Sequence, residues 1–94
     1  MIRSSSKNRP VAGFGMRDTN PPGRGAQISR VVKNSPAERA GLRIGDVIVK
    51  IDNRPTANIY DVQSVILSFY NPRDTADFIF IRNGKNMKTK IRFE

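Results

Sequence analysis

Apolar and polar residues alternate with a clear period in several stretches of the chain. From Ile59 to Phe69 the apolar side chains recur every three or four residues, which predicts a helix whose buried face centres on Val62 and Phe69. In residues 87–93 a cationic side chain stands at every second position, between Met87, Thr89, Ile91 and Phe93, which predicts a strand with one packed and one solvated face. Residues 75–82 contain a continuous apolar run and predict a fully buried strand.

A second, shorter helix is predicted by its end signals rather than by its period. Ser35 and Glu38 form a capping box, in which the Ser35 hydroxyl accepts from the Glu38 amide and the Glu38 carboxylate reaches back to the Ser35 amide. Pro36 suits the first helical position, and Gly41 suits a left-handed residue at the end. Residues 35–41 are therefore expected to be a helix, and the β-branched residues 47–51 a strand.

Turn and cap residues separate the remaining elements. Asn58, followed three residues later by Asp61, predicts the start of the long helix, and Asn71-Pro72 predicts its end. Asn83-Gly84 predicts a tight hairpin between the last two strands. Residues 14–18 and 26–32 are expected to be strands, joined by a loop rich in Pro and Gly.

Composition limits the classes of function. The 94 residues suffice for one domain, and the absence of Cys and His excludes disulfides, thiol chemistry and Ser–His or Cys–His catalysis. No apolar run is long enough for a membrane span, and no signal peptide is predicted. The net charge of +9 raises the alternative of a nucleic-acid or anionic-membrane surface. The basic residues are dispersed, however, which favours a solvated surface or an acidic partner.

Four motifs follow one another along the chain: GFGM at residues 13–16, the block SPAERAGLRIGD at residues 35–46, DVQSVI at residues 61–66 and RNGK at residues 82–85. Together and in this order, they resemble the motifs of PDZ domains. The last two resemble the PDZ domains of HtrA-type serine proteases in particular. The resemblance implies an α+β, mainly β fold, a partly open antiparallel barrel of five to six strands with two helices. It covers residues 9–94, and residues 1–8 are expected to be a flexible tail or linker.

The resemblance also implies a function, the capture of an extended or C-terminal peptide as an added strand. The loop from Gly13 through Phe14, Gly15 and Met16 would hold the terminal carboxylate with its backbone amides. Arg9 would lie near that carboxylate, or is one more solvated arginine. Further groove residues would be Arg17, Asp18, Ile59, Gln63, Ile66 and Tyr70.

Two positions depart from the family pattern. Ile59 stands where class I PDZ domains have His, so no polar group is expected to bind a Ser or Thr at the third-last ligand position. Asn53-Arg54 replaces the usual Asn-Gly, so either Arg54 adopts a left-handed conformation or the turn is of another type.

The predicted function is therefore that of a peptide-binding module and not an enzyme, with no cofactor and no metal. Its partners would be peptides with an apolar last residue, and the isolated domain would be a monomer. An alternative is a regulatory segment of a larger trypsin-like protease or envelope protein. The resemblance favours the periplasm or cell envelope, and the cytoplasm stays open.

Overall fold

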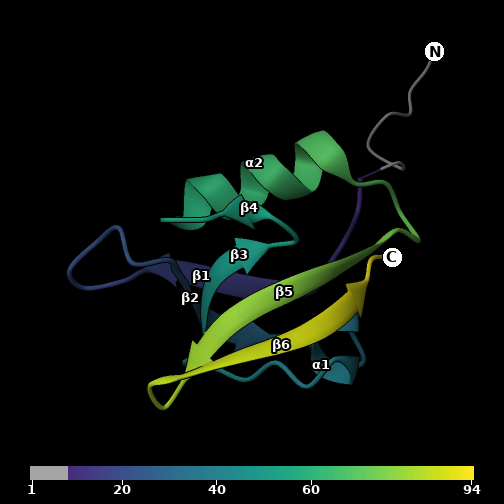
Figure 1. Ribbon diagram of the computed structural model, residues 1–94. Coiled ribbons are helices and arrows are strands. Elements are labelled where there is room, and N and C mark those ends of the chain that lie inside the picture. The colour runs from purple at the N-terminus through teal and green to yellow at the C-terminus, as the bar shows by residue number, and fades with distance from the viewer. Residues whose placement is uncertain (1–8) are drawn as a thin grey trace.

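The computed structural model describes residues 9–94, and the expected tail at residues 1–8 lies outside the described residues. The fold is α+β and mainly β, as predicted, with six strands and two helices (Figure 1). In chain order the elements are β1 (Phe14–Asp18), β2 (Ala26–Val31), α1 (Pro36–Arg39), β3 (Val47–Ile51), β4 (Arg54–Pro55), α2 (Ile59–Phe69), β5 (Thr75–Arg82) and β6 (Lys85–Arg92).

The strands form one antiparallel sheet in the order β1-β2-β3-β5-β6, with the short β4 paired to β3. β1 and β6 are the two edges and do not pair with each other, so the barrel is open. Val11, just before β1, exchanges two backbone hydrogen bonds with Glu94, just after β6 (2.8 and 3.0 Å). Figure 1 shows α2 lying along one side of the sheet and α1 at the opposite side, below β6. Within residues 9–94, no helix has the length and apolar character needed to cross a bilayer.

The core lies between α2 and the inner face of the sheet. Phe78 of β5 sits at its centre, fully buried, with edge-to-face contacts to Phe14 and Phe93 (centroids 6.1 Å apart in each case). Val62 and Ile66 of α2 pack onto it. β5 alternates between buried and half-buried residues, so the prediction of a fully buried strand was wrong. One of its faces is covered by the core and the other is not.

The predicted buried face of α2 was wrong in one respect. Val62 is buried, but Phe69 is 55% exposed and its ring lies under the Arg54 guanidinium, 3.7 Å from the centroid. The periodic pattern identifies a helix, but the position of the sheet decides which flank is covered. Phe69 therefore stacks on a cation at the surface instead of entering the core.

The caps of α1 follow the sequence prediction with one correction. The Ser35 hydroxyl accepts from the Glu38 amide (3.2 Å), and Gly41 is left-handed (φ 88°). The Glu38 carboxylate, however, accepts from the Asn34 amide (2.8 Å) and not from Ser35. The Ser35 amide is already committed to the Val32 carbonyl (3.3 Å).

The turn after β3 and the turn between β5 and β6 both contain residues with positive φ. Asp52 takes the left-handed conformation (φ 52°), so the turn after β3 is of another type and Arg54 starts β4. Asn83 and Gly84 both have positive φ (52° and 77°), as the predicted hairpin requires. β6 packs only toward its end, where Ile91 is buried, because its first residues extend beyond the core.

Candidate functional site

The free edge of β1 faces α2 across a hollow of about 500 Å³. Because β2 occupies only one side of β1, the backbone groups on its other side have no strand partner within residues 9–94. The hollow is lined by the segment before β1, β1 itself, the end of β2 and the middle of α2. Its lining residues are Arg9, Pro10, Val11, Ala12, Gly13, Phe14, Gly15, Met16, Arg30, Val32, Gln63, Ile66 and Leu67.

Gly13 determines the backbone path of the loop at one end of the hollow. It is left-handed (φ 86°), and a Cβ added there would lie 2.2 Å from the Cβ of Ser35, so only glycine fits. Its carbonyl accepts from the Val32 amide (2.8 Å). In a planar trans peptide the carbonyl and the next amide point in opposite directions, so the Phe14 N–H points away from β2 and toward the free edge.

The floor of the hollow is apolar and anchored in the core. Phe14 rests edge-on against Phe78, Met16 packs against the core, and Ile66 is only 8% exposed. Val32 and Leu67 on the rim are large apolar side chains that stay 42% and 55% exposed. An apolar floor with an exposed apolar rim is suited to bind an aliphatic or aromatic side chain.

The charged groups that line the hollow are all cationic. They are Arg9 from the segment before β1 and Arg30, which lies opposite Gly15 across the β1–β2 pair. Gln63 is the neutral polar side chain on the α2 side. With no carboxylate among its described lining residues, the site is electrostatically suited to an anionic group.

The structure gathers most of the predicted site residues and leaves out others. Arg9, the four residues from Gly13 to Met16, Gln63 and Ile66 line the one hollow. Arg17 is exposed but is not part of its lining. Asp18 and Ile59 instead fasten β1 to α2, because the Asp18 carboxylate accepts from the Ile59 amide (3.0 Å) at the start of the helix.

Tyr70 lies in the core, outside the hollow, contrary to the sequence expectation. α2 ends at Phe69, and Tyr70 has extended backbone angles (φ −130°, ψ 150°), so it leaves the helical period on which its placement was based. Its ring packs on Phe93, and its hydroxyl donates to the Asp52 carboxylate. Burial, with the hydrogen bond to Asp52, raises the pKa of Tyr70 to about 12. The same hydrogen bond lowers the pKa of the Asp52 carboxyl below its usual value.

Six lining residues were not predicted from the sequence: Pro10, Val11, Ala12, Arg30, Val32 and Leu67. Leu67 could have been found, because it follows Gln63 by four residues on the same helical flank. Arg30 could not, because the register shifts between Gly15 and Met16, and this bulge determines which β2 residue lies beside the loop.

The open sheet, the glycine loop beside its free edge and the facing helix define a PDZ-type fold. A family model described as PDZ domain matches residues 27–68. The chain belongs to the PDZ domain family and resembles its HtrA-type members. As a PDZ domain it is non-catalytic, although the relatives described next are proteases as whole proteins.

Similar sequences occur within several proteases. The magnetosome formation protease MamE of Magnetospirillum gryphiswaldense is 41% identical over 60 residues, which are 64% of this chain and 8% of that protein. The serine protease Do-like HtrA of Lactobacillus helveticus is 33% identical over 70 residues, 74% of this chain and 17% of that protein. The chain thus spans less than a fifth of the length of these relatives.

Solved structures of the same fold include complexes with peptides. The HtrA-type protease AlgW with a decapeptide aligns with a TM-score of 0.82 at 21% identity, covering 92% of this chain and 29% of that one. The HtrA3 PDZ domain bound to the phage-derived ligand FGRWV aligns with a TM-score of 0.79 at 24% identity, covering 93% and 86%.

Proposed function

We propose that this domain binds the C-terminus of an extended peptide, which adds as a strand to the free edge of β1. The observation that carries the proposal is the hollow between β1 and α2, which combines a free strand edge, an apolar floor and two cationic lining residues. An added strand would pair with backbone groups that otherwise face only solvent.

Each part of the hollow then has a role. The terminal carboxylate would accept from the backbone amides of Phe14, Gly15 and Met16, with Arg9 adding positive charge. The last side chain would enter the apolar floor beside Ile66. An apolar last residue is therefore expected, as in the FGRWV ligand of the HtrA3 domain.

The third-last ligand position would lie toward the start of α2. Ile59 is half-buried there and its amide is already bonded to Asp18, so it offers no side-chain partner to a hydroxyl. We expect an apolar residue at that position to bind better than Ser or Thr. Gln63 and Arg30 would contact the ligand between its two ends.

The relatives suggest where such a domain works. We propose that it is a peptide-sensing segment of an HtrA-like protease of the cell envelope, since the similar segments occur in proteases, one of them named periplasmic. The isolated domain is expected to be a monomer.

Peptides that differ only at the C-terminus test the carboxylate site. Amidation removes the charge, and because hydrogen bonds to charged groups contribute about 1.5–3 kcal/mol, affinity should fall about tenfold or more. Isothermal titration with a free and an amidated peptide ending in Val measures the difference.

A peptide ending in Asp instead of Val is the matched control for the apolar floor. It keeps the carboxylate but should bind more weakly than the Val peptide. Equal affinity of the free and amidated peptides would contradict the carboxylate site, and equal affinity of the Val and Asp peptides would contradict the apolar floor.

A further inference from the structure

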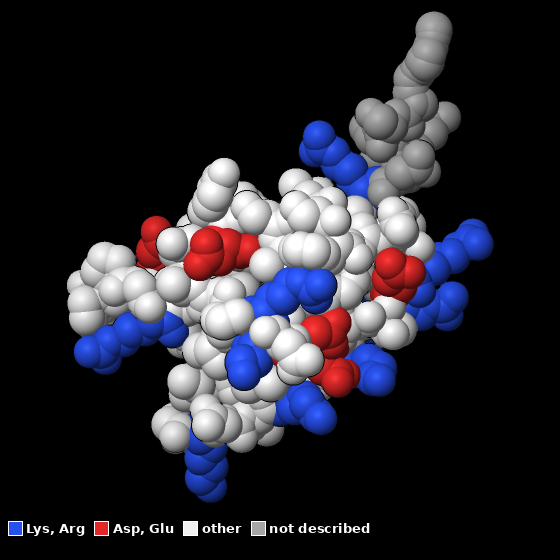
Figure 2. Space-filling model, turned by 45° about the horizontal axis from the view of Figure 1, so that its top comes forward, with Lys and Arg blue, Asp and Glu red and all other residues white. Residues whose placement is uncertain are grey.

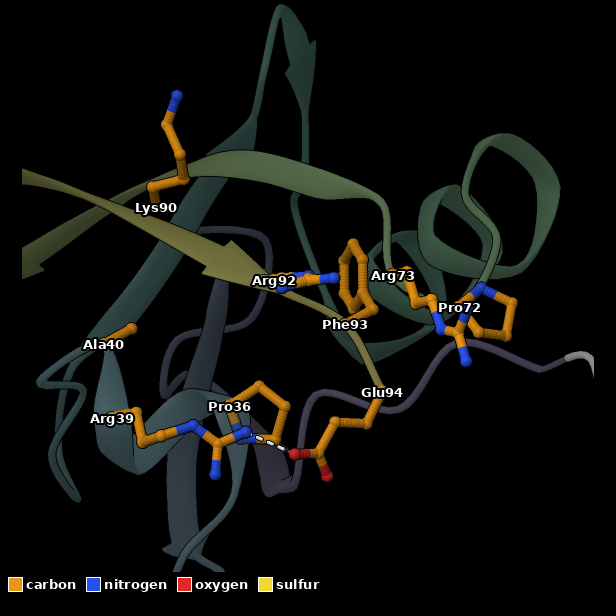
Figure 3. A pocket seen from close by; sticks show the side chains of 9 residues that line it. All are labelled: Pro36, Arg39, Ala40, Pro72, Arg73, Lys90, Arg92, Phe93 and Glu94. Carbon is orange, nitrogen blue, oxygen red and sulfur yellow. Dashed lines mark hydrogen bonds and ion pairs between the residues drawn. The ribbon is translucent and has the colours of Figure 1, made fainter.

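A second and larger hollow, of about 630 Å³, shares no lining residue with the first. It lies between α1, the connection from α2 to β5, and the end of β6 (Figure 3). Its lining residues are Pro36, Arg39, Ala40, Pro72, Arg73, Lys90, Arg92, Phe93 and Glu94.

The lining of this hollow is strongly cationic over an apolar base. Four of the nine lining residues are Lys or Arg, against one acidic side chain, that of Glu94. Pro36 and Phe93 are buried and form apolar parts of the wall. The cations come from α1, the α2–β5 connection and β6, so the fold brings together charges that are far apart in the sequence.

Two of these cations have no ion-pair partner among the described residues. Arg39 pairs with Glu94, as Figure 3 shows, and Lys90 pairs with Asp77 (3.6 Å). Arg73 and Arg92 form no such pair within residues 9–94. The Arg39 guanidinium is also held by the Asn34 carbonyl (2.6 Å), which keeps it pointed across the hollow toward Glu94.

Arg73 has a backbone conformation that disfavours arginine. It is left-handed (φ 77°), and every other left-handed position in residues 9–94 holds Gly, Asn or Asp. Its amide donates to the Phe93 carbonyl (2.9 Å), which fixes the position. Asn or Gly would adopt this turn with less strain, so arginine at this position costs stability. Such strain, held in place by its surroundings, points to a function of the side chain.

We propose that this hollow binds an oxyanion of more than one charge, a phosphate or phosphate ester, through Arg73, Arg92 and Arg39. The planar guanidinium matches the oxygen geometry of phosphate and can bind it with two parallel hydrogen bonds. In the free protein, the Glu94 carboxylate binds Arg39 at the place that an oxygen of the anion would take. It is displaced when the anion binds. The proposal is independent of the peptide groove.

Titration of the 94-residue chain with pyrophosphate, at constant ionic strength set with sodium chloride, tests the site. Amide shifts in NMR spectra should saturate and centre on residues around Arg73 and Arg92. R73N should weaken binding about tenfold while its stability to urea stays equal or rises, because Asn suits the left-handed turn. A purely structural role of Arg73 would instead lower stability in R73N.

Matched control variants distinguish a specific anion site from nonspecific electrostatic attraction to the basic surface. K85Q removes the same charge from the exposed hairpin and should change affinity less than twofold. E94Q removes the competing carboxylate and should tighten binding several-fold. The proposal is overturned if pyrophosphate gives no saturable shifts, or if R73N and K85Q weaken binding equally.

The phosphate could be free or part of a lipid headgroup. Vesicles of phosphatidylglycerol, compared with phosphatidylcholine, distinguish these sources. If R73N abolishes both pyrophosphate and vesicle binding, the ligand is a headgroup. If wild type binds pyrophosphate but not the vesicles, the ligand is a free phosphate compound. Both results support the site.

Discussion

Gly13 and Gly15 stand two residues apart in the loop beside β1, and their backbone requirements differ. Gly13 is left-handed, and any side chain there would overlap Ser35 at the start of α1. Gly15 has no positive φ, and a Cβ would lie 3.4 Å from the Cβ of Arg30, a contact that small adjustments relieve. The motif therefore contains one glycine that the fold requires and one that it tolerates.

Exchanging each glycine for Ala should separate these roles. G13A should lower the free energy of unfolding by about 1–3 kcal/mol, because it combines a left-handed Ala with an overlap. G15A should cost less than about 1 kcal/mol. Urea unfolding followed by circular dichroism measures both. Similar losses for the two variants would show that the loop moves freely and that Gly13 does not set its course.

At the scale of elements, Tyr70 and Asp52 fasten the end of α2 to the sheet. The Asp52 carboxylate accepts from the Tyr70 hydroxyl and from the Asp77 amide (2.9 Å), and the Asp52 amide donates to the Asp77 carbonyl (2.7 Å). The helix end, the turn after β3 and β5 thus meet at one carboxylate. At the other end of the helix, the hydrogen bond from Ile59 to Asp18 fastens α2 to β1.

The hydrogen bond between Tyr70 and Asp52 predicts that the stability of the domain depends on pH. The pKa of Tyr70 is raised from 10.0 to about 12, so its stabilisation is complete below pH 10 and is lost between pH 10 and 12. The pKa of Asp52 is lowered, so its contribution is present above its usual pKa and declines as the pH falls below that value. Y70F lacks the titrating hydroxyl and one donor to Asp52.

The stability difference between wild type and Y70F should therefore be largest near neutral pH and shrink at both extremes. Urea unfolding of both proteins from pH 3 to 11.5 measures it, and the subtraction cancels the titration of all other groups. A stability difference that stays constant across this pH range would contradict a stabilising hydrogen bond between Tyr70 and Asp52. S68A, an exposed change two residues away in α2, is a control that should show no such pH dependence.

At the scale of the whole molecule, the full sequence carries a net charge of +9. Figure 2 shows basic and acidic side chains interspersed on one face, with the basic ones scattered out to its edges. The screening length at physiological salt is about 8 Å, so only cations close to a bound peptide affect it strongly. Arg9 and Arg30 line the hollow where we propose that the peptide binds, whereas Arg17 does not line it.

R30E should therefore weaken the binding of an acidic peptide more than that of a neutral one. K88E makes the same charge change on β6, away from the hollow, and should alter both affinities by at most a few-fold. Titrating both peptides into both variants measures the difference. If K88E abolished binding and R30E had no effect, the basic sheet face would be the main site, and a nucleic-acid or membrane ligand would be favoured over a peptide.

Most of the fold prediction depended on interactions between residues that are close in the sequence. The caps at Ser35 and Asn58 and the Asn83-Gly84 turn depend on contacts within a few residues, so the sequence alone specifies them. The motif GFGM likewise indicates the loop, because glycine permits the left-handed conformation that Gly13 adopts. These local signals sufficed to predict the class of fold, and seven of the predicted site residues line one hollow.

Contacts between distant segments decided the rest. The path of the chain after Phe69 placed Tyr70 in the core, and the register shift at Ser29 of β2 brought Arg30 to the hollow. The basic hollow joins Arg39 to Arg73 and Arg92, which no local pattern connects. Sequence periodicity determines which residues can share a face, but only tertiary packing determines what that face meets.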